Sequence, residues 1–341
     1  MVGMRVLAST EKYRIVFHQA GKARTDIVVI TFAGQPHSLD DKGFGTEYCL
    51  RHGWDTIYVS QLRGTEFQGL SREAFLEVVA PEVEGRDVVC YGSSLGGYTA
   101  FYYGGSLDAR IIAAAPVFPA LMKVWRGGES PVEFTHSELK DVPRTSKSPF
   151  IIYDPMQTAD KEFLDRAIRP AYPEGLRVAE YERGGHTVLE TLKRVGRLSF
   201  MADLIERDEF TPPKPLEPGD FDYHLTNGTI LKSRDPDQAI EELERALEVK
   251  PSNRVTIHLL PMLIRQGRLD RAQEIINDAN NACDDEQRIS GRFRDELLSA
   301  GLEVESDDVV RERIRAKRLK ERRAKIDAAR REAAMRKSQS Q

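Results

Sequence analysis

The sequence has few cysteines and no long apolar run, and these absences exclude several classes of protein. Three cysteines, Cys49, Cys90 and Cys283, are spread over 341 residues without any Cys-x-x-Cys pair. Neither a disulfide framework nor a zinc ribbon is therefore indicated. No stretch approaches the ~18 consecutive apolar residues that a membrane-spanning helix needs, and the first residues lack the pattern of a secretory signal. We expect a cytoplasmic protein without a membrane span.

The sequence also lacks a common nucleotide-binding motif and a strong net charge. No Gly-x-x-x-x-Gly-Lys-Ser/Thr loop occurs, and we expect neither an organic cofactor nor a metal. The formal net charge is only −4. Thirteen Lys or Arg and four Asp or Glu lie between Arg311 and Lys337, so the rest of the chain is acidic. Because runs of charge on a helix are usually solvated, we do not expect nucleic acid to be a partner.

Short apolar β-branched runs alternate with helical patterns over the first two thirds of the chain. The expected strands are residues 13–18, 27–32, 56–60, 88–91, 111–117, 150–153 and 177–181. Several are apolar throughout, as in strands that are covered on both faces. The expected helices include residues 46–52, 95–103 and 187–205. This alternation predicts an α/β domain over residues 1–210, with a doubly wound, mainly parallel sheet.

A dense group of prolines ends this pattern. Four prolines lie between Thr211 and Gly219, and proline at this density favours extended, stiff chain. We therefore place a linker at residues 211–220.

Beyond the linker the patterns are helical only, and a weak repeat is present. Asp237-Gln-Ala239 recurs as Asp270-Arg-Ala272, with an offset of 33 residues. The spacing resembles the tetratricopeptide repeat, whose period is about 34 residues, although Pro261 interrupts the pattern and an unrelated helical hairpin is the alternative. We expect a small all-α helical-repeat domain at residues 221–300 that packs on the first domain or on a partner protein.

The last segment, residues 301–341, is rich in Arg, Lys, Glu and Ala and has few large apolar residues. It is expected to form a basic, solvated helical tail that becomes disordered after about Arg330.

The strongest local motif is Gly92-Ser93-Ser94-Leu95-Gly96, between the apolar run 88–91 and a helical pattern. The pattern Gly-x-Ser-x-Gly puts a serine on a sharp strand-to-helix turn. A Cβ two residues away on either side would clash with the folded backbone there. Ser94 lies midway between the glycines and is the expected nucleophile, with a purely structural Gly-rich turn as the alternative.

Over about residues 10–207 this arrangement resembles the α/β-hydrolase superfamily and, less specifically, hydrolase-like proteins encoded near bacterial surface-polysaccharide genes. In the superfamily the catalytic triad runs Ser, acid, His along the chain. The resemblance implies that His186, after the last strand and two glycines, is the general base. It implies an acid after the strand 150–153, where both Asp160 and Asp154 are candidates. The position in the loop favours Asp160, while a helix N-cap and an Asp-Pro turn are the structural alternatives.

The resemblance also implies an oxyanion hole. Its donors would be the N–H of Leu95 and an N–H from the loop at residues 32–36, with Ala33 as the first candidate. About thirty residues between Val117 and Phe150 occupy the place of a cap, and so short a cap predicts an open site for a polar or large substrate.

Together these features predict a serine hydrolase that cleaves or transfers an acyl group on a small-molecule or saccharide ester. The alternative is a non-catalytic adaptor that keeps the hydrolase fold and acts through its helical repeats.

Overall fold

In the computed structural model of this chain, the described residues are 3–21, 25–35, 38–282, 284, 287–289 and 291–338; side chains are not described at 291, 292, 307 and 326–338. Pro36, His37 and Cys283 therefore lie outside the described residues. The chain forms two compact units, Met1–Leu216 and Glu217–Gln341. Each unit is described by itself.

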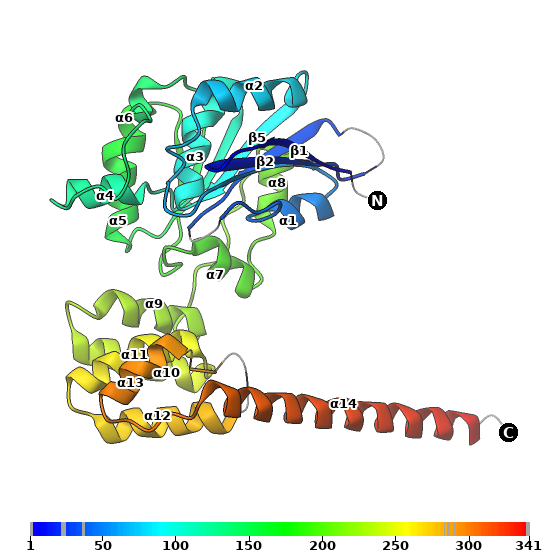
Figure 1. Cartoon of the computed structure of the whole chain (residues 1–341), viewed down its shortest axis with the longest axis vertical. Helices are drawn as coiled ribbons and strands as arrows, with labels where there is room; N and C mark the ends of the chain where they lie inside the picture. The colour runs from blue at the N-terminus through cyan, green and yellow to red at the C-terminus, as the bar shows by residue number, and fades with distance from the viewer. Residues whose placement is uncertain are drawn as a thin grey trace. The chain divides into compact units, whose positions relative to one another are not determined.

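The first unit is built on an eight-stranded sheet with the order β1-β2-β4-β3-β5-β6-β7-β8 (Figure 1). The strands are β1 (Met4–Ser9), β2 (Tyr13–His18), β3 (Ile27–Phe32), β4 (Asp55–Gln61), β5 (Asp87–Ser93), β6 (Arg110–Ala114), β7 (Phe150–Tyr153) and β8 (Arg177–Glu180). β2 pairs antiparallel with β1 and β4, and all other neighbours are parallel. The prediction of a mainly parallel sheet is confirmed.

Strand β1 was not expected from the sequence. It is an edge strand whose residues are exposed or only partly buried, so its composition lacks the continuous apolar run of the central strands. A bulge interrupts its pairing with β2 between Val6 and Ala8.

The strand order also determines where a site can form. From β3 the chain passes to β4 on one side, and from β5 it passes to β6 on the other. The crevice outside the carboxyl ends of strands at such a reversal is the usual ligand site of open α/β sheets. Here this position lies between the ends of β3 and β5.

Helices cover both faces of the sheet. The helices of this unit are α1 (Thr46–Arg51), α2 (Arg72–Val83), α3 (Leu95–Gly104), α4 (Pro119–Trp125), α5 (Thr158–Phe163), α6 (Arg169–Ala171), α7 (Val188–Arg194) and α8 (Phe200–Arg207). Helices α2 and α3 lie on one face, and α1 and α8 lie on the other (Figure 1). The unit also contains two short 3₁₀ segments (Gly105–Leu107 and Leu139–Asp141) and a π-helical turn (Leu164–Ile168).

One expected helix is divided in two. The sequence predicted a single helix at residues 187–205, but the structure has α7 and α8 with a turn between them. Gly196 lies in that turn with a φ of 69°, a left-handed conformation that ends helices and that glycine adopts without strain.

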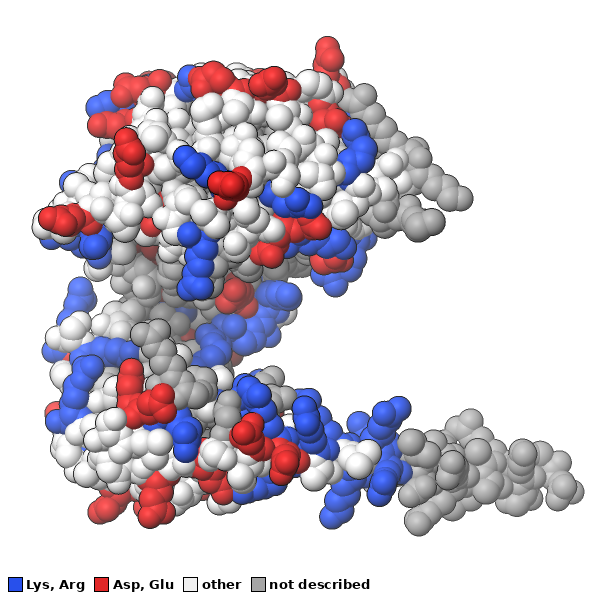
Figure 2. Space-filling view, viewed as in Figure 1, with Lys and Arg blue, Asp and Glu red and all other residues white. Residues whose placement is uncertain are grey.

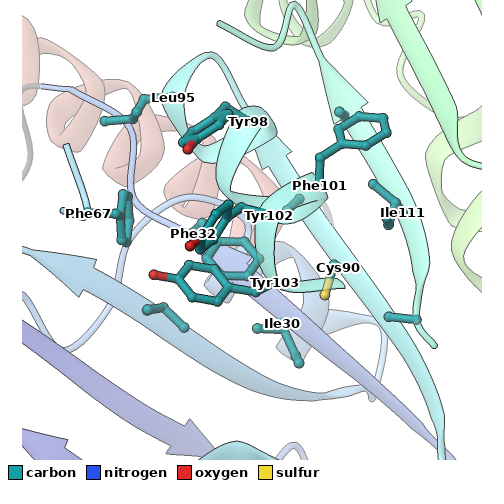
Figure 3. Close-up of a cluster of buried hydrophobic side chains, with 14 of the residues drawn as sticks. Ile30, Phe32, Phe67, Cys90, Leu95, Tyr98, Phe101, Tyr102, Tyr103 and Ile111 are labelled. Atoms are coloured by element: carbon teal, nitrogen blue, oxygen red, sulfur yellow. The ribbon is translucent and has the colours of Figure 1, made fainter. Parts of the chain in front are cut away.

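Aromatic side chains fill the space between α3 and the sheet (Figure 3). Phe32 of β3 stacks on Tyr103 of α3 with ring centroids 6.0 Å apart. Phe75 of α2 packs on the same tyrosine at 4.4 Å. All three side chains are fully buried. This core fixes α3, and hence the residue that precedes it, relative to β3 and β5.

The second unit contains only helices among its described elements. They are α9 (Phe221–Leu231), α10 (Pro236–Val249), α11 (Asn253–Arg265), α12 (Leu269–Ala282), α13 (Gly291–Ser299) and α14 (Asp307–Ser338). Helices α10 and α12 begin at residues 236 and 269, the same spacing as the sequence repeat. Pro261 lies inside α11, so the chain continues as helix at the position where the repeat pattern breaks. The likeness to a tetratricopeptide array stays a prediction.

Helix α14 extends to Ser338, and the expected disorder after about Arg330 stays a prediction. Lys and Arg side chains lie along its described part (Figure 2). Strongly helix-forming Ala, Glu, Lys and Arg make up most of its length, which favours a long exposed helix even without an apolar stripe. No helix in the described part of the chain has the length and apolar character required to cross a membrane.

We expect limited proteolysis with a broad-specificity protease to cut first within residues 211–219. This segment contains neither helix nor strand, and most of its residues are exposed, so little local unfolding is needed before a protease can bind it. Mass spectrometry of the first two fragments is the measurement. A first cut within β5 or α3 would contradict this division of the chain.

Candidate active site

Ser94 lies at the turn between β5 and α3 with a strained backbone. Its φ is 54° and its ψ is −123°, in a region that costs a residue with a Cβ on the order of 1–3 kcal/mol. The turn is held by neighbours on both sides. Ser94 N–H donates to the Ala114 carbonyl at 2.9 Å, and the Ser94 carbonyl accepts from the N–H of Val117 at 3.1 Å. The strain therefore persists because the end of β6 and the loop after it are bonded to the same residue.

The glycines of the motif are required by close backbone approach. A Cβ on Gly92 would lie 2.0 Å from the Gly96 carbonyl oxygen, and a Cβ on Gly96 would lie 2.7 Å from that of Phe32. Neither distance is possible for real atoms, and backbone cannot move aside as a flexible side chain can. The spacing Gly-x-Ser-x-Gly follows from these two contacts.

The structure brings Ser94, His186 and Asp160 into one hydrogen-bonded chain. His186 Nε2 is 2.8 Å from Ser94 Oγ, and His186 Nδ1 is 2.7 Å from Asp160 Oδ1. With a neutral imidazole, Nδ1–H donates to the carboxylate and Nε2 accepts from the serine hydroxyl. His186 precedes α7, and Asp160 is in the first turn of α5 with only 3 % of its surface exposed.

The pKa of His186 reflects two opposing effects. Burial lowers the pKa of the imidazole, but the hydrogen bond and the charge of Asp160 raise it by more, so the net shift is upward. The imidazolium form is thus stabilised at the position where a proton from Ser94 would arrive.

Asp154 lies outside this hydrogen-bonded chain and holds the loop that carries His186. It is fully buried. Its Oδ2 accepts from the Gly185 N–H, and its Oδ1 accepts from the Met156 N–H, both at 2.9 Å. Burial raises the pKa of this carboxyl, and the bonds from these amides partly offset the rise. Of the two candidate acids, only Asp160 contacts the His186 ring.

The candidate oxyanion donors differ from expectation. The Ala33 N–H donates to the Val59 carbonyl at 2.9 Å, because the pairing of β3 with β4 continues one residue past the strand. Ala33 is therefore wrong as an oxyanion donor. Within the described residues, the N–H of Leu95 has no hydrogen-bond partner. The same is true of the N–H of Gln35, which lies two residues after Ala33.

A shallow cavity of about 750 Å³ lies beside Ser94. Its lining combines the hydrogen-bonded residues with both polar and apolar side chains, and includes Gln35, Val117, Met122, Lys123, Arg126 and Gln157. A separate cavity of about 460 Å³, lined by Tyr98, Phe118, Trp125 and others, contains none of the three hydrogen-bonded residues. No group of His, Cys, Asp and Glu among the described residues could hold a metal ion.

Sequence reasoning missed one buried residue of this region, Glu66. Glu66 lies in the loop after β4, where Arg63, three residues earlier, is exposed. Glu66 is 4 % exposed and accepts hydrogen bonds from the Gln35 side chain and the Ala120 N–H. The only signal was the pair of apolar residues Phe67 and Leu70 in an otherwise polar loop, which indicates a loop packed on the core.

No protein-family model and no curated protein sequence matches the chain. Among solved structures it is similar to a capsule O-acetyltransferase of Neisseria meningitidis serogroup A, at 15 % identity over 55 % of this chain and 91 % of that chain, with a TM-score of 0.39. It is also similar to Est1E from Butyrivibrio proteoclasticus, at 14 % identity over 60 % of this chain and 100 % of that chain, with a TM-score of 0.42. A third similar structure is Thermogutta terrifontis esterase 2, at 15 % identity over 62 % of this chain and 96 % of that chain, with a TM-score of 0.40.

Proposed function

We propose that this chain is a serine hydrolase of the α/β-hydrolase superfamily that cleaves or transfers the acyl group of an ester. The observation that carries the proposal is the chain of two short hydrogen bonds from Asp160 through His186 to Ser94. The serine of this chain sits on a strained strand-to-helix turn at the carboxyl edge of the sheet, as a nucleophile of this class requires.

The first half of the reaction forms an acyl-enzyme. Ser94 Oγ attacks the ester carbonyl while its proton passes to His186 Nε2, and Asp160 stabilises the imidazolium and holds the ring in position. The carbonyl oxygen becomes an oxyanion, for which the N–H groups of Leu95 and Gln35 are the proposed donors. The tetrahedral intermediate then expels the alcohol, which takes the proton from His186.

The second half uses the same groups in reverse. Water or a second alcohol gives a proton to His186 Nε2 and attacks the acyl carbon, and Ser94 recovers its proton as it leaves. Attack by water gives hydrolysis, and attack by an alcohol gives acyl transfer.

We propose a polar or large ester, such as an O-acylated saccharide, as the substrate. Support comes from the shallow cavity beside Ser94, whose lining includes the polar residues Lys123, Arg126 and Gln157. A long alkyl chain would find no enclosed channel among these residues. A panel of p-nitrophenyl esters and O-acetylated oligosaccharides tests this. We expect kcat/KM to fall from acetate to longer acyl chains and acetate release from the saccharides; a steady rise with chain length would overturn it.

Replacing the nucleophile should abolish the chemistry without unfolding the protein. Ser94→Ala removes Oγ, so we expect loss of p-nitrophenyl acetate hydrolysis and of labelling by a fluorophosphonate probe, with the melting temperature unchanged or raised because alanine has no hydroxyl to desolvate. Ser93→Ala is the matched control and should still be labelled. If the wild-type protein is not labelled at all, the adaptor alternative takes the place of this proposal.

The two aspartates should behave differently. Asp160→Asn leaves the ring without its carboxylate, so we expect a loss in kcat of about 10⁴-fold, as in a related triad. Because activity requires neutral His186 and Asp160 raises its pKa, the acid limb of the kcat/KM profile should also move to lower pH.

Asp154→Asn can accept only one of two buried N–H bonds, so it should lose about 1–3 kcal/mol of stability but keep most of its activity and its pH profile. The opposite pattern would assign the acid to Asp154.

A further inference from the structure

Glu66 is a buried carboxylate at the same edge of the sheet as Ser94, in the loop between β4 and α2. Both of its oxygens are occupied: Oε1 accepts from Gln35 Nε2, and Oε2 accepts from the Ala120 N–H, each at 2.9 Å. No Lys, Arg or His of the described residues forms an ion pair with it. Burial raises its pKa, and the two hydrogen bonds only partly offset that rise.

One of these bonds fixes the loop after β3. Residues 33–35 belong to neither helix nor strand, and the position of the Gln35 backbone depends on how that short loop is held. The Ala33 N–H is bonded to β4, which fixes the start of the loop. The Gln35 side chain is fixed by Glu66, which thereby limits where the Gln35 N–H can point.

The other bond fixes one wall of the cavity. Ala120 is the second residue of α4, and the N-cap residue of that helix, Phe118, makes no side-chain capping bond. The Glu66 carboxylate accepts one of the N–H groups that a helix start leaves without a partner. Helix α4 supplies Met122 and Lys123 to the cavity beside Ser94. A single carboxylate thus links the loop after β3 to the cavity wall.

The backbone of this loop is strained at Glu66, whose side chain is buried. Glu66 and Phe67 have φ values of 47° and 61°, an unusual pair for residues with a Cβ. Packing of Phe67 holds the strained backbone in place, because its side chain is buried edge-on against Phe32 (Figure 3). Its N–H also donates to Gln61 Oε1 at 2.6 Å. A strained backbone and a buried carboxylate without an ion-pair partner are both costly, and such features concentrate at functional sites.

We propose that Glu66 is a positioning residue that holds the Gln35 N–H in the oxyanion hole. This inference rests on the proposed serine-hydrolase function. Because an oxyanion exists only in the tetrahedral intermediate and its transition states, Glu66 acts on kcat and leaves ground-state binding nearly unchanged.

The test is Glu66→Leu in the full-length chain, with p-nitrophenyl acetate and a fluorophosphonate as probes. Leucine has no acceptor oxygen, so the bonds from the Gln35 side chain and from the Ala120 N–H are both lost. We expect kcat to fall about 10- to 100-fold with KM changed less than about twofold, and the phosphonylation rate to fall in parallel. The acid limb of the pH profile should stay in place, because Asp160 and His186 are untouched.

Gln35→Ala tests the same link from its other end. It keeps the backbone N–H but removes the anchor, so kcat should again fall, and the double variant should be no slower than the slower single variant. If Glu66→Leu does not fold, Gln35→Ala carries the test, and wild-type kcat in that variant overturns the proposal. Losses that multiply in the double variant would also overturn it.

Asp108→Asn is the matched control. Asp108 has a φ of 45°, and its carboxylate joins two loops by bonds from Ser146 N and Ser146 Oγ, but it precedes β6 at the opposite edge of the sheet. It should lower the melting temperature without changing kcat. Equal kcat losses in Glu66→Leu and Asp108→Asn, or wild-type kcat in Glu66→Leu while the wild type is labelled, would refute the role of Glu66 and leave the serine-hydrolase proposal intact. Absence of wild-type labelling would instead refute the hydrolase proposal.

Discussion

The close approach of β5 and α3 at Ser94 is the constraint on which the rest of the site depends. The backbone of Gly96 occupies the space that a Cβ on Gly92 would need, and Ser94 takes a φ of 54° between them. Such a turn projects the serine side chain beyond the edge of the sheet. It also leaves the N–H of Leu95 at the start of α3 without a helical partner, since the first amides of any helix have none. The proposed nucleophile and the proposed oxyanion donor therefore come from the same turn.

The remaining groups reach Ser94 because parallel strands end at one edge of the sheet. The loops after β3, β4 and β8 carry Gln35, Glu66 and His186, and Asp160 lies in the first turn of α5, which follows β7. Each loop is fixed by a buried acceptor or an apolar anchor: Asp154 holds the loop of His186, and Glu66 holds that of Gln35. Asp154 and Glu66 thus each hold a neighbouring loop, although they follow different strands, β7 and β4. These loops are thus held by internal hydrogen bonds as well as by the strands from which they start.

Much of this could be predicted from one sequence, for identifiable reasons. Central strands such as β2 and β3 have the expected bounds, because continuous apolar runs are rare outside doubly covered strands. Ser94, His186 and Asp160 were singled out by a motif and by chain order, and the structure puts them within hydrogen-bonding distance; their catalytic roles stay a prediction. The error at Ala33 has a different cause, since only the register of β3 on β4 decides which N–H the sheet uses. Glu66 could not be found, because no sequence pattern distinguishes an inward-facing glutamate from the exposed Arg63 three residues earlier.

The bulge in β1 has a consequence for how the molecule behaves at high concentration. An edge strand presents a row of free backbone donors and acceptors to which another chain can add as a further strand. In β1 the pairing shifts between Val6 and Ala8, and Arg5 extends from the strand to Glu82 of α2 in an ion pair. A twisted edge that carries a charged side chain is a poor template for strand addition. The exposed Met4 and Val6 therefore lie on an edge that opposes edge-to-edge growth of the sheet into aggregates.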